Sequence, residues 1–275
     1  MIALPPIVGA VASAGTDAAF ADRVRALVAA RFGYSPRPAA MAYLRSVLAQ
    51  RQASRPAEDY WRLLLGSPEE LQALVEDMLN HETACGRTPP HFEALRRFVL
   101  PVLLTSGRAV RIASLGCATG EEAYTLALTA IEAGDVGDAV QVVGLDLSHR
   151  ALRTARAGEY SEFSVRELSD PQCAAGFIRA GGTYRVRPQV ARKVRFVQHN
   201  LLEPLPLVGV EVIFCRNVLI YFEPEAANRV LANIRDALAP GGWLFLGHSE
   251  SALHLRAWFE PVSFAETLVY RRRSS

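Results

Sequence analysis

The sequence predicts an α/β protein in which a mostly parallel sheet follows an all-helical domain. Residues 111–128 read RIASLGCATGEEAYTLAL, an apolar run that breaks at Gly116 and Gly120 and then resumes with helical spacing. A change from strand to tight loop to helix is typical of α/β folds. A second apolar run, VQVVGL, ends at Asp146, and apolar runs alternate with helical patterns from there onward.

The helical part comes first along the chain. Apolar side chains recur at helical spacing from residue 17, and residues 39–52, 58–65 and 68–79 predict further helices. Ser67 is the expected N-cap of the last of these, because an acidic first turn follows it. We expect a flexible N-terminus at residues 1–16 and a helical domain at 17–89. A linking helix at 90–107 then leads to the sheet domain at 108–275.

The C-terminal half supplies the remaining strands of the sheet. Strands are expected at 194–198 and 210–214, and a helix at 223–238 leads through a Pro-Gly-Gly turn into the apolar run WLFL. The Gly181-Gly182 turn and the alternation that follows it predict a short antiparallel excursion at about 180–195. This excursion interrupts the regular series of strands and helices.

The loop after the first strand has the features of a site for a nucleotide-like ligand. Gly116 and Gly120 give the backbone freedom to turn, and the helix that opens after them directs unpaired N–H groups and a positive dipole end at the loop. Asp146, at the end of the second strand, is placed to accept hydrogen bonds from ribose hydroxyls. The alternative is that the glycines serve only the turn and the acid only caps a helix, since the loop is not GxGxxG.

Composition excludes several classes of protein. Half of the 275 residues are hydrophobic, but no apolar run approaches the roughly 20 residues of a membrane span. The net charge is +2 and no basic run interleaves with aromatics, so nucleic-acid binding is not expected. The four cysteines are scattered and form no metal-binding pattern. We therefore expect a cytoplasmic protein with no metal site and no membrane insertion.

Four ordered segments carry a resemblance to a known family. GCATGEEAYTLAL, NLLE, FCRNVLIYF and LAPGGWLFLGHSE closely resemble the CheR-type chemotaxis receptor methyltransferases, over roughly residues 75–275. The resemblance implies a class I (Rossmann-like) methyltransferase sheet with a small inserted β-subdomain, and S-adenosylmethionine as cofactor. It also implies transfer of a methyl group to glutamate carboxylates, giving methyl esters. A carboxylate is already ionised near pH 7, so this nucleophile needs no general base.

One segment departs from the family pattern. Where members typically read NETxFFR, this chain reads HETACGR: it keeps Glu82, Thr83 and Arg87 but has His81 in place of Asn and Cys85-Gly86 in place of two phenylalanines. The lost aromatic rings lead us to expect a more flexible segment or a different pocket at Gly86.

The resemblance also assigns the site residues. The resemblance implies that Arg216, Tyr221 and Arg87 are catalytic, and that Arg216 binds the carboxylate of the substrate. The positions that match the family's cofactor site are His81, Thr83, Arg87, Gly116, Gly120, Glu121, Asp146, Asn200, Leu201, Cys215, Arg216 and Asn217. Other interpretations stay open. Tyr221 can simply pack in the core, and Arg87 can be a surface arginine. Glu121 can serve only to interact favourably with the helix dipole, and Asn217 can stabilise its loop through side-chain to backbone hydrogen bonds.

The expected partners are the cytoplasmic helices of methyl-accepting chemotaxis receptors. In the family a basic helix of the helical domain is thought to meet these acidic helices, and Arg51 and Arg55, with Arg45 and Arg37 nearby, are the candidates here. The alternative is an ordinary solvated face. Two alternatives remain: a CheR-like regulatory protein that binds the cofactor without transfer, and a methyltransferase that acts on a small carboxylic acid.

Overall fold

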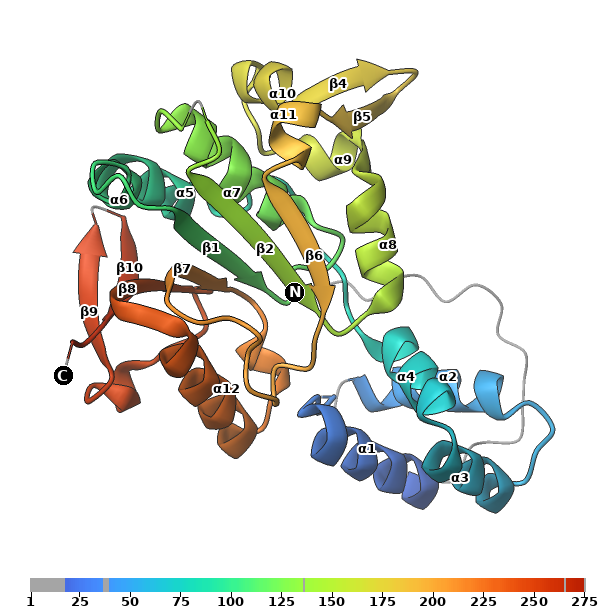
Figure 1. The fold of residues 1–275 in the computed structure, drawn as a ribbon. Helices are drawn as coiled ribbons and strands as arrows, with labels where there is room; N and C mark the ends of the chain where they lie inside the picture. The colour runs from blue at the N-terminus through green and yellow to red at the C-terminus, as the bar shows by residue number, and fades with distance from the viewer. Residues whose placement is uncertain (1–17, 37–39, 136, 265, 275) are drawn as a thin grey trace. The chain divides into compact units, whose positions relative to one another are not determined.

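A computed structural model describes residues 18–36, 40–135, 137–264 and 266–274 (Figure 1). The N-terminus expected to be flexible, residues 1–16, lies outside these ranges. Within them the chain forms two compact units, a helical unit and a sheet unit. Apart from the gaps just given, the helical unit comprises 18–31 and Ser35–Met78, and the sheet unit comprises Phe32–Tyr34 and Leu79–Ser275.

The helical unit contains the helices that the sequence predicts. They are α1 (Ala18–Phe32), α2 (Met41–Gln52), α3 (Ala57–Gly66) and α4 (Pro68–Met78). Leu48, Tyr60 and Leu74 are fully buried and form part of the core of this unit. The predicted N-cap is confirmed, because the Ser67 Oγ accepts a hydrogen bond from the Glu70 N–H at 3.1 Å.

The basic face expected on the second helix is wrong in part. Arg51 makes ion pairs at 3.0 Å with Glu70 and at 2.5 Å with Asp77, and the Tyr60 hydroxyl donates to the same Glu70 carboxylate at 2.8 Å. Its guanidinium therefore ties α2 to α4 instead of facing solvent. Arg55 lies beyond the end of α2, and Arg37 lies outside the described residues, which leaves Arg45 as an exposed basic residue on this helix.

The sheet unit is built on seven strands (Figure 1). Their order is β6-β2-β1-β7-β8-β10-β9, and the neighbours are parallel except at β8/β10 and β10/β9. The strands are β1 (Val110–Leu115), β2 (Val140–Asp146), β6 (Val194–Gln198), β7 (Val210–Cys215), β8 (Leu238–Leu246), β9 (Phe259–Phe264) and β10 (Thr267–Arg272). The order reverses beside β1, and ligands of such sheets bind at that point, outside the carboxyl ends of the strands.

The central strands are buried on both faces, which explains why they read as nearly continuous apolar runs. Side chains alternate between faces, so Ile112 and Phe214 belong to one core and Ala113 and Ile213 to the other. The first core includes residues of the α5–η2–α6 segment and α7, and the second includes residues of α12. The helices of the sheet unit that flank the main strands are α5 (Pro89–Ala94), α6 (Leu100–Leu104), α7 (Glu121–Glu132), α8 (His149–Ala157) and α12 (Pro224–Ala237), and a π-turn, η2 (Leu95–Val99), joins α5 to α6.

The predicted antiparallel excursion forms a second, three-stranded sheet with the order β3-β5-β4. It lies earlier than the expected 180–195. Residues 188–191 are helical instead, and the strand from Val194 belongs to the main sheet. The elements are β3 (Glu159–Ser161), α9 (Glu162–Val165), α10 (Asp170–Gly176), β4 (Phe177–Ala180), β5 (Thr183–Val186) and α11 (Pro188–Ala191).

The boundary between the units differs from the expected one at residue 89. The segment after Met78 belongs to the sheet unit, because the Cys85 N–H donates to the Ser164 carbonyl at 2.8 Å and the Gly86 N–H to the Thr125 hydroxyl at 3.1 Å. Phe32–Tyr34 belongs there too. Tyr34 forms a β-bridge with Phe222, a contact across 188 positions that no local pattern indicates.

No helix in the described ranges is long and apolar enough to cross a membrane.

Candidate functional site

The loop after β1 is held against the end of β2. The N–H groups of Gly116 and Cys117 both donate to the Leu145 carbonyl, at 2.8 and 3.1 Å. Gly116 has a φ of 66°, and a Cβ there would lie 2.5 Å from a methyl carbon of Val218. Glycine is therefore required twice at this position, for the turn and for the close approach of Val218.

Asp146 fastens this loop to the sheet. One carboxylate oxygen accepts the Ala118 N–H at 2.8 Å, and the other accepts the Ser148 N–H at 2.8 Å. The side chain is buried at the carboxyl end of β2 and lines a pocket. Two charge-assisted bonds thus fix the direction of the carboxylate, where the sequence places a ribose-binding acid.

The pocket lies at the carboxyl ends of β1, β2, β6 and β7 and encloses about 630 Å³ of empty space, including its open mouth. Seven residues expected at the site line it: His81, Gly116, Asp146, Asn200, Leu201, Asn217 and Tyr221. The lining combines polar side chains with apolar ones, which suits a ligand that carries both a ribose and a purine ring.

Several lining residues were missed from the sequence. Phe32, Tyr34, Leu147, His199, Val218 and Phe222 also line the pocket. The Tyr34 and Tyr221 ring centroids are 5.8 Å apart, and the Tyr221 hydroxyl accepts from the Asn80 amide at 3.4 Å. Gly33 was an available signal, because its φ of 71° favours glycine and a Cβ there would lie 2.5 Å from the Phe222 ring.

Other predicted cofactor residues do not line the pocket, namely Thr83, Arg87, Gly120, Glu121, Cys215 and Arg216. Gly120 serves packing, because a Cβ there would lie 2.8 Å from the Ala155 Cβ. Glu121 is buried and accepts a hydrogen bond from the Thr119 hydroxyl at 2.7 Å, and burial raises its pKa. Cys215 is fully buried at the end of β7.

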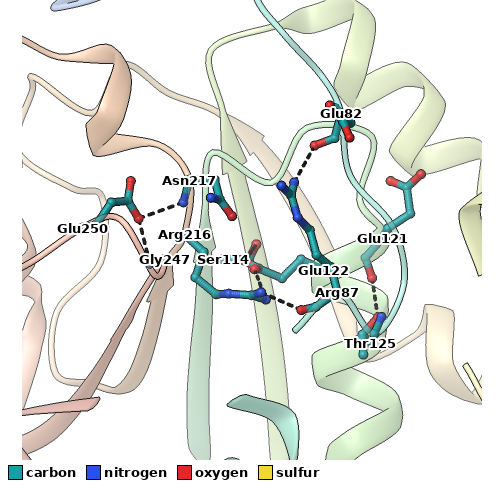
Figure 2. A network of polar contacts seen from close by, with 11 residues as sticks. Glu82, Arg87, Ser114, Glu121, Glu122, Thr125, Arg216, Asn217, Gly247 and Glu250 are labelled. Carbon is teal, nitrogen blue, oxygen red and sulfur yellow. Dashed lines mark hydrogen bonds and ion pairs between the residues drawn. The ribbon is translucent and has the colours of Figure 1, made fainter. Parts of the chain in front are cut away.

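Arg216 occupies a different place from the one expected of a residue that grips a substrate carboxylate (Figure 2). Its side chain is 3% exposed and forms an ion pair with Glu122 at 3.0 Å. Its other terminal nitrogen donates to the Arg87 carbonyl at 2.5 Å. Burial lowers the pKa of Arg216 and raises that of Glu122, and each charge opposes the shift of the other. In this geometry the guanidinium holds the Arg87 backbone, and the substrate-binding role of Arg216 stays a prediction.

The segment that departs from the family pattern is anchored as well. The Arg87 side chain donates to the Glu82 carbonyl at 3.0 Å (Figure 2), while Gly86 is fixed to Thr125 as described above. Gly86 has a φ of 74° and borders a second hollow of about 830 Å³, which Leu168 also lines. A hollow is therefore present at this glycine, and whether it differs from the family's pocket stays a prediction.

His91 is a buried histidine close to Arg216 that sequence analysis did not single out. It is 2% exposed, stacks on His248 with 5.6 Å between ring centroids, and its Nδ1 makes no hydrogen bond within the described residues. Burial, the Arg216 charge and His248 lower its pKa from 6.5 to about 3. His91 is therefore neutral in the folded protein at neutral pH.

The pKa of His91 predicts a pH dependence of stability. Below pH 6.5 His91 takes up a proton in the unfolded chain but stays neutral in the folded chain. Its contribution to the free energy of unfolding is therefore complete above pH 6.5 and is lost as the pH falls toward 3. Its contribution should fall by about 2 kcal/mol between pH 7 and pH 5. Urea unfolding of the wild type and of His91→Phe at several pH values measures this contribution. The free energy of unfolding should depend less steeply on pH in the variant than in the wild type. Equal slopes would mean that His91 takes up its proton at the same pH in the folded and the unfolded chain.

In the part of the chain that the structure describes, no group of histidine, cysteine and acidic side chains is placed to hold a metal ion.

Comparisons with known proteins relate this pocket to a family. Residues 81–268 match the family model described as CheR methyltransferase, SAM binding domain. The chain is 34% identical over 261 residues to the probable biofilm formation methyltransferase WspC of Pseudomonas aeruginosa, covering 92% of this chain and 62% of that protein. It is 35% identical over 212 residues to chemotaxis protein methyltransferase 1 of the same species, covering 74% of this chain and 77% of that protein.

A solved structure of an O-methyltransferase family protein from Burkholderia thailandensis aligns with 94% of this chain and 72% of its own, at 15% identity and a TM-score of 0.44, a likeness too weak to indicate function. The family match itself includes β1, β2, β6 and β7, whose ends form the pocket, so S-adenosylmethionine is the cofactor. Its extent over residues 81–268 shows that the chain belongs to the CheR methyltransferase family.

Proposed function

We propose that this chain transfers a methyl group from S-adenosylmethionine to glutamate carboxylates of methyl-accepting chemotaxis receptors, in the cytoplasm. The observation that carries the proposal is the Asp146 carboxylate, held on the pocket wall by the Ala118 and Ser148 N–H groups. The family match and a relative named chemotaxis protein methyltransferase 1 support the choice of acceptor.

The residues of the pocket fit the cofactor. Asp146 can accept from ribose hydroxyls, and Leu201 and Asn200 offer an apolar surface and an amide to the purine. Gly116 lets the Val218 side chain pack against the loop that lines the pocket. When bound, S-adenosylmethionine supplies an electrophilic methyl group on a positively charged sulfur. The Tyr221 ring lines the pocket and can stabilise such a positive charge.

The acceptor glutamate is ionised at neutral pH, so the chain needs to align it and exclude water, with no base required. Because Arg216 is buried against Glu122, we assign the orientation of the incoming carboxylate to Arg87 and Tyr221. Arg87 is partly exposed, and its backbone is held by Arg216. A guanidinium can pair with both oxygens of a carboxylate and so fix its direction.

Transfer of a radiolabelled methyl group tests the function. Purified chain, labelled cofactor and a receptor's cytoplasmic fragment should give a base-labile methyl product on the receptor. Cofactor binding without transfer to any acceptor would indicate a regulatory protein instead. A base-labile product on a small acid, with none on the receptor, would indicate the small-acid methyltransferase.

The exposed Arg45 provides a test of the receptor partner. Reversing it to glutamate should raise the apparent KM for the receptor severalfold and flatten its salt dependence, since attraction between exposed charges acts mainly at encounter. Cofactor affinity should not change, because Arg45 does not line the pocket. Arg62→Glu, another exposed arginine of the helical unit, is the matched control. Identical salt profiles in Arg45→Glu and the wild type would rule out this docking face.

A further inference from the structure

One carboxylate accepts hydrogen bonds from four backbone N–H groups beside the pocket. Glu250 follows β8, and one of its oxygens accepts from Gly247 at 2.7 Å and from Asn217 at 2.8 Å. The other oxygen accepts from Val218 at 2.7 Å and from Ile220 at 3.3 Å. Figure 2 shows the bonds to Asn217 and Gly247. A single side chain thus joins the turn after β7 to the turn after β8.

The chain is shaped to receive this carboxylate. A Cβ at Gly247 would lie 2.6 Å from the Glu250 oxygen and 2.9 Å from the Asn217 nitrogen, so only glycine leaves room for the contact. Asn217 has a φ of 59°, a left-handed conformation that asparagine adopts more readily than most other non-glycine residues. The Glu250 bond to its N–H helps to hold this turn, and those to Val218 and Ile220 hold the residues that follow.

The turn that Glu250 holds is a wall of the cofactor pocket. Asn217, Val218 and Tyr221 line the pocket, whereas Glu250 does not. The Val218 side chain lies against Gly116, close enough to exclude any Cβ there. The position of Val218 therefore determines how the turn fits the loop after β1, and Glu250 fixes that position through the backbone.

We infer that Glu250 is a positioning residue, which sets the shape of the cofactor pocket by holding the 217–221 turn against the loop after β1. The inference rests on the proposed function only in taking this pocket as the one that holds S-adenosylmethionine. This role needs a carboxylate, because both of its oxygens accept hydrogen bonds. A glutamine side chain of nearly the same shape would direct an NH₂ group at two of the four N–H donors.

Calorimetry with S-adenosylhomocysteine, the demethylated product, provides the test. Glu250→Gln should bind about tenfold more weakly than the wild type, equivalent to about 1.4 kcal/mol. Gly247→Ala should have a similar effect, because the added methyl group displaces the carboxylate without removing it. Glu260→Gln, the same substitution at an exposed position of β9, is the matched control and should bind like the wild type.

Amide hydrogen exchange separates positioning from a general loss of stability. In Glu250→Gln, exchange should quicken at Asn217, Val218, Ile220 and Gly247 while the amides of β1 and β2 stay protected. Wild-type affinity in Glu250→Gln and Gly247→Ala would overturn the inference, even if their melting temperatures fell. Binding of the product needs no acceptor, so a failure to methylate receptors would refute the proposed function without deciding this test.

Discussion

Replacing Arg216 with alanine is expected to lower the free energy of unfolding by about 3–5 kcal/mol, because it leaves the Glu122 charge buried without its partner. The two side chains are 3% and 14% exposed, so water cannot replace the lost ion pair. The change also removes the hydrogen bond to the Arg87 carbonyl. Urea unfolding followed by far-UV circular dichroism measures the loss.

Two further variants show whether the buried charge is the cause. The double variant Arg216→Met with Glu122→Gln should recover much of the stability, since it leaves no unpaired charge. Arg229→Ala removes an arginine that is 57% exposed, and its cost should stay within about 0.5 kcal/mol. If Arg216→Ala kept wild-type stability and cofactor affinity but lost methyl transfer, the arginine would act on the substrate, as the sequence first indicated.

The different place of Arg216 follows from strand geometry that the motif does not show. Side chains of β7 alternate between faces, and Arg216 continues the face of Phe214, two residues earlier. Its guanidinium carbon lies 5.4 Å from the centre of the Phe92 ring and 6.0 Å from that of Phe214, both of which belong to the first core. The family motif locates the residue, but alternation along the strand turns its side chain away from the pocket.

Features encoded within a few residues were predictable from the sequence. The turn at Gly116 and the acid at Asp146 were found because each lies at the carboxyl end of a strand, and the order of strands makes these ends neighbours. The cap at Ser67 was found for the same reason, as its partner Glu70 is three residues away. In these cases the local pattern and the final structure agree.

Features that depend on distant contacts were not predictable. Tyr34 reaches the pocket through a bridge to Phe222, and Glu250 reaches Asn217 across 33 positions. Arg51 looked like part of a basic surface until its partners Glu70 and Asp77, on another helix, were known. Each of these side chains has an ordinary local setting, and its role comes from the chain that folds against it.

The sequence likewise does not show how much of Asp146's effect on cofactor affinity comes from direct contact with the ligand and how much from the position of the loop. Asp146 holds the loop through Ala118 and is also the expected ribose ligand, so removing it combines a change in loop position with the loss of ligand contacts. A ligand analogue that lacks one hydroxyl separates these contributions, because it leaves the loop bond in place.

Replacing Asp146 with alanine should weaken S-adenosylhomocysteine binding by about 1.5–3 kcal/mol, or roughly 10–150-fold, as expected for the loss of a hydrogen bond to a charged group. In calorimetry the 2′-deoxy analogue should bind the wild type less well than the parent compound, whereas Asp146→Ala should not distinguish them. Asp236→Ala removes an acid that is 65% exposed and should leave both affinities unchanged. If Asp146→Ala still favoured the parent compound by the wild-type ratio, another residue would hold the ribose and Asp146 would serve only to fasten the loop.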